Sequence, residues 1–111
     1  MLSNPIRRAI QFIDERFCDS TLSLKVVASA SGLSVPHLCR ELKRVDGRGF
    51  RSRLHIARTQ EASRLLSESQ LSIKQIAAAV GYGHSSHLCR HFRKQFGTTP
   101  SNFRRLATLQ Q

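Results

Sequence analysis

Apolar residues recur at helical spacing along most of this chain, and short polar stretches separate the segments that carry them. In the first segment Ile6, Ile10, Ile13 and Phe17 follow one another at intervals of three or four residues, which places them on one face of a helix. We therefore predict an amphipathic helix over residues 5–17. No segment alternates apolar and polar residues over enough positions to indicate a strand, so the pattern predicts an all-α fold.

Residues that favour helix ends divide the next part of the chain. Asn4 and Pro5 are suited to start the first helix, as its N-cap and first-turn proline. Ser23 is expected to cap a short helix that continues through Ser31. Gly32 then stands where a helix needs a left-handed terminator. The sequence predicts that one helix ends here and that another begins a few residues later.

Ser34 is the expected cap of that next helix, and Pro36 falls in its first turn, where a missing N–H costs little. Two helices joined by a short turn around a glycine form a helix-turn-helix. Leu38, Leu42 and Val45 share one face of the second helix and are predicted to be buried. The residues left on its other faces, and available to a ligand, are Val35, Pro36, Cys39, Arg40 and Lys43.

The tetrapeptide His-Leu-Cys-Arg occurs twice, at residues 37–40 and 87–90, and the segment 22–33 resembles the segment 71–82. A unit of about fifty residues in only two copies is too short an array for a solenoid, which needs roughly three. We therefore predict two helix-turn-helix units side by side.

The second copy carries its own helix signals. Ser72 followed by Gln75 is a capping box, and Gly81 is placed to end the first helix of the pair. The residues predicted to be buried in this copy are Ile73, Ile76, Ala77, Val80, Leu88, Phe92 and Phe96. The residues of its second helix predicted to point outward are Ser85, Ser86, Cys89, Arg90 and Arg93.

Residues 50–67, between the two copies, contain neither Gly nor Pro and predict one long linking helix. At about 1.5 Å per residue it would be roughly 27 Å long, close to the roughly 34 Å between successive major-groove faces on one side of B-DNA. Phe103 and Leu106 predict a short closing helix. The expected organisation is about seven helices, with a first helix-turn-helix subdomain over residues 1–49 and a second over residues 68–111.

The charge of the chain indicates a polyanionic partner. It has 18 Lys and Arg residues against 7 Asp and Glu residues, a formal net charge of +11. The basic residues are spread over at least four segments, whereas a membrane-binding helix would concentrate them. No apolar run approaches the roughly 18 residues of a transmembrane helix, and the start lacks the apolar core of a signal peptide. We expect a cytoplasmic protein that binds double-stranded DNA and no membrane.

Arg40 and Arg90 occupy equivalent positions, where each could make a bidentate contact with guanine worth about 1 to 3 kcal/mol of discrimination. The alternative is pairing with a neighbouring Glu or a phosphate. Cys39 and Cys89, one residue earlier, either lie against a thymine methyl group or are tolerated small residues. The residues expected to contact phosphates, unless they are solvated surface charges, are Lys43, Arg44, Lys74, Arg93, Lys94 and Arg104.

The sequence contains no motif that indicates an enzyme. Its three cysteines include no Cys-x-x-Cys pair, so reduced thiols are expected. A thiol or metal sensor on the same scaffold, with Cys39, Cys89 or the face of His84, His87 and His91 as its input, is an alternative. His84, His87 and His91 could converge on a metal, but they lack an acidic or thiolate partner at a matching angle. We therefore expect no bound metal and no cofactor.

The second copy also resembles a known family signature. It reads Ile73-x-x-Ile76-Ala77-x-x-x-Gly81-Tyr82, followed by His87-Leu88-x-Arg90-x-Phe92-Arg93-Lys94-x-Phe96-Gly97-x-Thr99-Pro100-Ser101-x-Phe103-Arg104. This run is similar to the signature of AraC/XylS-type transcription regulators, and the resemblance covers nearly the whole chain. It implies a monomeric, sequence-specific DNA-binding domain that inserts two recognition helices into adjacent major-groove segments. By position, the implied base-reading residues are Val35, Pro36, Cys39 and Arg40 in the first copy and Ser85, Ser86, Cys89 and Arg90 in the second.

Two residues depart from the family pattern. His84 replaces the Ser or Asp that is common there, so Ser85 is expected to cap the second recognition helix instead. Pro36 replaces a larger residue of some members, which suggests that specificity rests mainly on the second helix.

The resemblance also implies regulation of transcription through a surface presented to RNA polymerase. Such a surface fits an activator, although the sequence leaves activation and repression open. A nonspecific nucleic-acid binder is a further alternative. Most members carry an effector or dimerisation domain, so the chain is either a stand-alone regulator or the C-terminal part of a longer one.

Overall fold

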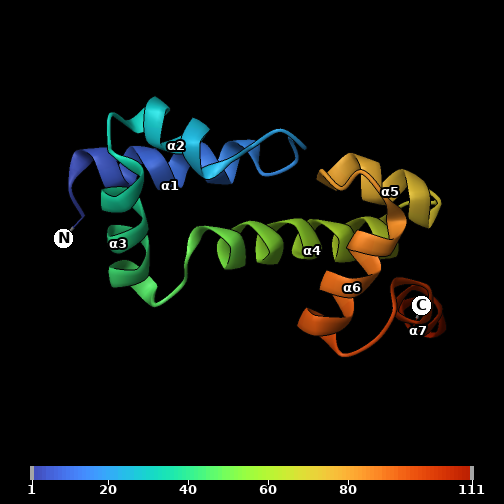
Figure 1. Ribbon diagram of the computed structural model, residues 1–111. Coiled ribbons are helices and arrows are strands. Elements are labelled where there is room, and N and C mark those ends of the chain that lie inside the picture. Colours follow the sequence, from blue (N-terminus) through green and yellow to red (C-terminus); the bar gives the residue numbers. More distant parts are fainter. Residues whose placement is uncertain (1, 111) are drawn as a thin grey trace.

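The computed structural model describes residues 2–110, and within this range the chain forms seven α-helices and no strand (Figure 1). The all-α prediction, with two helix-turn-helix units on either side of a long helix, is confirmed. None of these helices is both long and apolar enough to cross a membrane. The helices are α1 (Asn4–Arg16), α2 (Leu24–Ser31), α3 (Val35–Asp46), α4 (Phe50–Glu68), α5 (Ile73–Val80), α6 (Ser85–Phe96) and α7 (Pro100–Leu109).

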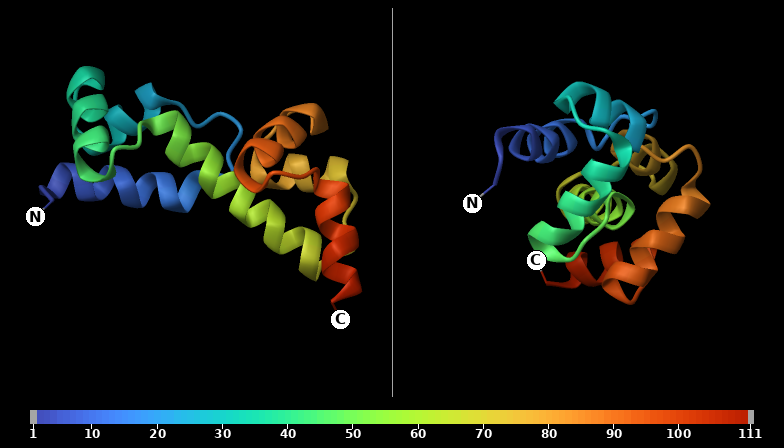
Figure 2. Two further views of the ribbon diagram at one scale, coloured as in Figure 1. Left: turned by 90° about the horizontal axis from the view of Figure 1, so that it is seen from below. Right: turned by 60° about the vertical axis from the view of Figure 1, so that its left-hand side comes forward.

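The helices form two groups at the ends of α4. The molecule measures 45 × 24 × 20 Å along its principal axes, with α1 to α3 at one end and α5 to α7 at the other (Figure 1). In the left view of Figure 2, α3 and α6 stand at the upper side of the molecule, whereas α1 and α7 lie at the lower side. The second helices of the two units therefore project in the same direction.

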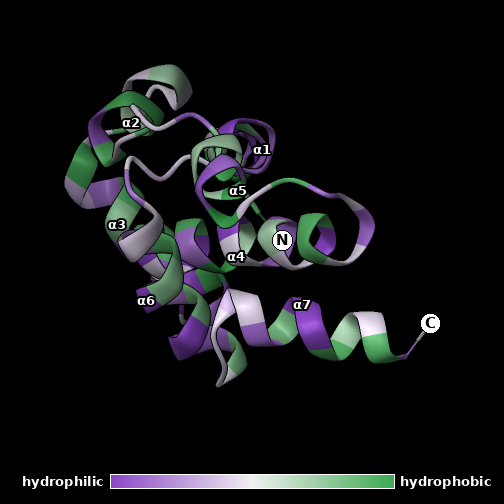
Figure 3. Cartoon of the chain, turned by 90° about the vertical axis from the view of Figure 1, so that its right-hand side faces the viewer, coloured by the Kyte–Doolittle hydropathy of each residue, from purple (hydrophilic) through white to green (hydrophobic). Residues whose placement is uncertain are grey.

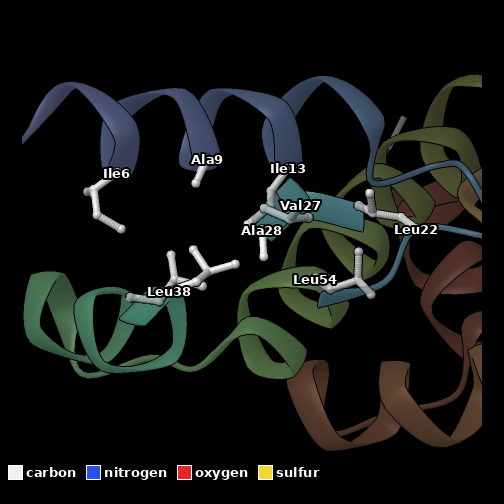
Figure 4. Packing of buried hydrophobic residues seen from close by; sticks show 9 residues of the cluster. Ile6, Ala9, Ile13, Leu22, Val27, Ala28, Leu38 and Leu54 are labelled. Carbon is white, nitrogen blue, oxygen red and sulfur yellow. The ribbon is translucent and has the colours of Figure 1, made fainter. Parts of the chain in front are cut away.

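The first group has its own apolar core, in which α1 packs over α2, α3 and the start of α4 (Figure 4). Full burial of one Val, Leu or Ile side chain contributes about 1.5 to 3 kcal/mol to the free energy of unfolding, so this cluster supplies much of the stability of the first group. Leu38 and Leu42 are fully buried, as predicted, and Val45 packs at the edge. The buried residues are Ile6, Ala9, Ile13, Leu22, Val27, Ala28, Leu38, Leu42 and Leu54.

The second group has a separate core around Phe92, whose ring centre lies 4.5 Å from that of Phe96 and 5.4 Å from that of Phe103. One prediction fails at its edge: Phe96, which was expected to be buried, is 36% exposed. Phe96 is the last residue of α6, and its ring still stacks on Phe92. Leu106 is 45% exposed, and Figure 3 shows hydrophobic positions, in green, toward the free end of α7. The buried residues are Ala62, Leu66, Ile76, Ala77, Val80, Tyr82, Leu88 and Phe92.

Most helix ends lie where the capping residues predict them. The Ser23, Ser34 and Ser72 hydroxyls accept hydrogen bonds from backbone N–H groups of the first turns, and Gln75 completes the capping box. The expected cap of the first helix is wrong. Ser3 accepts the hydrogen bond from the Ile6 N–H, which makes Asn4 the first helical residue. A serine hydroxyl and an asparagine amide cap about equally well, so position relative to the proline decides between them.

Candidate nucleic-acid interface

The outward face of α3 contains the residues predicted to read bases in the first copy. Leu38 and Leu42 anchor α3 to the core at full burial, and this fixes which face points away from it. Val35, Pro36 and Arg40 are exposed, whereas Cys39 is half-buried. Cys39 lines a groove between α3 and α4, together with Phe50 and Arg51 among others.

The outward face of α6 repeats this arrangement. Leu88 and Phe92 are fully buried, Ser86 and Arg90 are exposed, and Ser85 and Cys89 are half-buried. The structure thus brings each predicted set of base readers together on one helix, and the two helices project on the same side of the molecule (Figure 2).

The charges on α3 are partly neutralised within the helix. Glu41 accepts hydrogen bonds from Arg44, and its Oε1 lies 3.8 Å from Nε2 of His37. The hydrogen bond from Arg44 lowers the pKa of the Glu41 carboxyl group, so that group stays ionised. Asp46, at the end of α3, pairs with Arg53 of α4 at 2.7 Å. Arg44, which was expected to contact phosphate, therefore already has a carboxylate partner.

The charges on α6 have no acidic partner within the helix, because its three basic residues, Arg90, Arg93 and Lys94, are accompanied by no Asp or Glu. The place taken by Glu41 in the first copy is occupied by His91. All three basic residues are exposed. This helix therefore presents more uncompensated positive charge than α3 does.

Arg104 lies apart from the other residues predicted to contact phosphates. Its Nε donates to the Leu66 carbonyl at 3.1 Å and its Nη2 donates to the Ser69 carbonyl at 3.3 Å. These bonds satisfy carbonyl groups at the C-terminal end of α4, which lack partners within the helix. Sequence reasoning missed this role because the partners lie more than thirty residues away.

The N-terminus of α6 begins without a side-chain cap. His84 occupies the cap position and its side chain accepts no hydrogen bond from the helix, whereas Ser85 is already helical. The expectation that Ser85 caps α6 is therefore wrong. Lys74, His84 and Ser86 are among the residues that line a pocket at this helix start. Free N–H groups, the helix dipole and a lysine together form a site suited to an anion.

The histidines of the second copy do not converge. The His91 ring stacks on His55 of α4, with centres 3.6 Å apart, while His84 and His87 meet edge to face at 5.4 Å. His55 Nδ1 also lies 2.7 Å from the Tyr82 hydroxyl. Between residues 2 and 110, no group of three or more His, Cys, Asp or Glu side chains is placed to hold a metal ion.

Burial and positive neighbours disfavour the charged form of both stacked histidines. Desolvation lowers the pKa of His55 to about 4, and His91, Arg58, Arg51 and Arg90 lower it further in the same direction. Burial also lowers the pKa of His91, aided by Arg90 and Lys94. A charged imidazolium in this place would lose hydration and face several cations.

Arg51 is a candidate interface residue that sequence reasoning missed. It is exposed near the start of α4 and lines the same surface hollows as Cys39 of α3 and His91 of α6. It therefore lies between the two recognition helices. Its position at the start of the linking helix was visible in the sequence, but the facing direction of that helix was not.

Comparisons with known proteins agree with this architecture. The chain matches a family model described as a helix-turn-helix domain over residues 27–106. It is 35% identical over 94 residues to the uncharacterized HTH-type transcriptional regulator YijO of Escherichia coli, covering 85% of this chain and 33% of that protein. The chain spans about a third of the length of the first curated relatives it matches.

Solved structures show the same fold. The C-terminal domain of AraT, a response regulator from Geobacillus stearothermophilus, superposes with a TM-score of 0.91 at 35% identity, covering 95% of this chain and 87% of that one. The DNA-binding domain of AdpA, a global transcriptional factor solved in complex with a target DNA, superposes with a TM-score of 0.92. At 23% identity, and with coverage of 98% of this chain and 97% of that one, it supports the fold alone.

The chain therefore belongs to the AraC/XylS-type family of helix-turn-helix domains. This is a family of DNA-binding transcription regulators rather than of enzymes.

Proposed function

We propose that the chain binds duplex DNA as a monomer by inserting α3 and α6 into two successive major-groove segments. The observation that carries this proposal is the projection of α3 and α6 from the same side of the molecule, with α4 between them (Figure 2). The 19 residues of α4 rise about 28 Å, close to the roughly 34 Å between successive major-groove faces.

Base reading is assigned to the outward residues of the two helices, with Arg40 and Arg90 in the leading roles. Both guanidinium groups are exposed, and neither forms an ion pair with any residue in the described range. A bidentate contact with guanine O6 and N7 is worth about 1 to 3 kcal/mol of discrimination. The supporting readers are Val35, Pro36, Cys39, Ser85, Ser86 and Cys89.

Phosphate contacts are assigned to exposed basic residues around these helices: Lys43, Lys74, Arg93, Lys94 and the newly identified Arg51. Arg44 can join them if a phosphate displaces Glu41. If the protein neutralises roughly six phosphates, its affinity for DNA should fall about 10³-fold when the salt concentration rises from about 50 to 200 mM. The reason is that counterion release drives binding less strongly at higher salt.

The biological role proposed for this binding is regulation of transcription in the cytoplasm. Family membership supports it. Activation through a contact with RNA polymerase is the form we propose, since a monomer with one DNA-binding side leaves α1 and α7 on its opposite side (Figure 2).

Selection of bound sites from a random duplex library at about 150 mM salt tests the DNA-binding proposal. The expected result is an asymmetric site with two elements about one helical turn apart. A palindromic site would indicate a dimer and contradict monomer binding. Recovery of no preferred sequence would contradict specific recognition.

A further inference from the structure

The two apolar cores do not touch along α4, because a short polar section separates them. Leu54 is the last residue of α4 in the first core and Ala62 is the first in the second core. Between them the buried residues are Arg58, 6% exposed, and Thr59, fully buried. The relative orientation of the two halves is therefore not set by a shared apolar core.

Arg58 instead joins the two halves through its guanidinium group. Its Nε donates to the Phe17 carbonyl at 2.7 Å and its Nη2 donates to the Asp19 carbonyl at 3.0 Å, both in the loop after α1. The same group lies 5.2 Å from the centre of the Tyr82 ring, in the turn between α5 and α6. One side chain thus touches the first half on one side and the second half on the other.

Gly81 brings the second half close enough for this contact. A Cβ atom at Gly81 would lie 2.9 Å from Arg58 Nε, nearer than real Cβ atoms approach other groups, and 3.0 Å from the Cys18 carbonyl oxygen, tighter than most real Cβ contacts. Tyr82 is held in turn by the 2.7 Å hydrogen bond between its hydroxyl and His55. The turn before α6 therefore rests directly on the loop after α1.

We propose that Arg58 is a positioning residue that fixes the orientation of α6 relative to α3, and so sets the spacing between the two DNA elements that the protein accepts. A buried guanidinium group is stable only when its donors are satisfied, so this contact has one favoured geometry. The inference about the spacing of the two DNA elements rests on the proposed function. The inference about the orientation of α6 relative to α3 does not, because that orientation is a property of the protein without DNA.

The orientation is tested by measuring the distance between α3 and α6 in solution. Spin labels are attached at Lys43→Cys and Arg93→Cys, exposed and equivalent positions of the two helices, in a background of Cys18→Ser, Cys39→Ser and Cys89→Ser. Pulsed electron paramagnetic resonance should give one narrow distance distribution. Arg58→Lys, which retains the charge but loses the fork of donors, should broaden it about twofold, as expected when a second orientation becomes populated.

Arg104→Ala is the matched control. Arg104 also donates through Nε and Nη2 to two backbone carbonyls, but both lie within the second half of the molecule. This variant should lose stability while keeping the narrow distribution. If the Arg58→Lys distribution stays as narrow as that of the parent, with circular dichroism showing a folded chain, the proposed role of Arg58 is wrong.

The spacing is tested with duplexes in which the two selected elements are kept and the spacer is changed by one base pair. Such a change shifts one element by about 3.4 Å along the axis. The parent should bind the altered spacing about tenfold more weakly, equivalent to about 1.4 kcal/mol. Arg58→Lys should largely lose this penalty and keep the base preferences of each element.

The outcomes separate the two proposals. An unchanged spacing penalty in Arg58→Lys contradicts the positioning role. If selection yields no two-element site, the proposed function fails and the spin-label distances alone decide whether Arg58 sets the orientation. If Arg58→Lys does not fold, Tyr82→Leu is the replacement variant, because it removes the ring that the Arg58 guanidinium group contacts in the second half. It is tested by the same spin-label distance between α3 and α6.

Discussion

The two helix-turn-helix units share a backbone plan and differ in their surfaces. Leu38 and Leu88 are both fully buried at equivalent positions, and Gly32 and Gly81 both end the preceding helices in the left-handed conformation. The outward positions diverge. Where α3 has Glu41, which neutralises Arg44, α6 has His91, which stacks on α4.

We expect this difference to divide the work of DNA binding unequally. Helix α3 carries three basic and two acidic residues, a net charge of +1, whereas α6 carries three basic and no acidic residues, a net charge of +3. The equivalent buried residues of the two units maintain the same fold in both. Substitutions on the outward faces of α3 and α6 change the charge and the side-chain contacts at little cost in stability. We therefore expect substitutions in the second unit to have the larger effects.

The two turn glycines should give the clearest contrast. Both adopt positive φ, so alanine costs about 1 to 2 kcal/mol at either place. Gly32 has nothing within 4 Å of an added Cβ atom, whereas Gly81 meets Arg58 and the Cys18 carbonyl. Gly81→Ala should lower the free energy of unfolding by about 3 kcal/mol and Gly32→Ala by about 1 kcal/mol, measured by urea titration. Equal losses would show that the contact is loose.

The equivalent arginines should differ in binding. Arg90→Ala is expected to reduce affinity for the selected site by about 2 kcal/mol, and Arg40→Ala by less than about 1 kcal/mol, because the hypothesis assigns the greater share of specificity to α6. Fluorescence anisotropy with the selected duplex and a scrambled one separates base reading from general attraction. Equal losses of specificity would contradict the hypothesis that the second helix dominates.

The starts of the two recognition helices predict opposite effects on stability. Ser34 caps α3 through its hydroxyl, so Ser34→Ala should lower the free energy of unfolding by about 1 kcal/mol. His84 makes no such bond, so His84→Ser should raise it by about 0.5 to 1 kcal/mol. Thermal unfolding of both variants checks the signs, and no gain from His84→Ser would mean that solvent already satisfies this helix end.

The charge contrast predicts a change in salt dependence. Glu41→Gln frees Arg44 for a phosphate, so the slope of log affinity against log salt concentration should steepen by about 0.9 for the one added contact. Glu15→Gln on α1, where Glu15 accepts a hydrogen bond from Gln11 away from both recognition helices, is the control and should leave the slope unchanged.

The stack of His55 of α4 on His91 of α6 predicts a pH dependence of stability at the contact between the linking helix and the second unit. The folded pKa of His55 is about 4, below its ordinary value of 6.5, so the unfolded chain binds the proton more readily. The contribution of His55 to stability is complete above about pH 6.5 and falls as the pH drops toward about 4. Urea midpoints at several pH values should show this decline, and His55→Gln should flatten it. An unchanged profile in His55→Gln would assign the decline to other groups, His91 first.

The sequence predicted most of the fold because helix signals act over a few residues. Capping serines, turn glycines and apolar spacing identify the starts of α2, α3, α4 and α5, whereas the expected starts of α1 and α6 are each wrong by one position. The same spacing identified the outward faces of α3 and α6. Because Leu38 and Leu88 are buried, the residues on the opposite side of each helix must point away from the core. The spacing failed at Phe96, because it shows which residues share a face but not how far the neighbouring core extends.

What the sequence by itself determined is therefore the pair of helix-turn-helix units, their buried stripes and the excess of positive charge. Only the tertiary structure decided which basic residues are available to DNA and how the two units are oriented. Arg58 and Arg104 are indistinguishable in the sequence from DNA-binding arginines, yet each donates to backbone carbonyls 35 to 41 residues away. The physical reason is that such carbonyls become partners only after distant segments have packed together, so no local pattern records them.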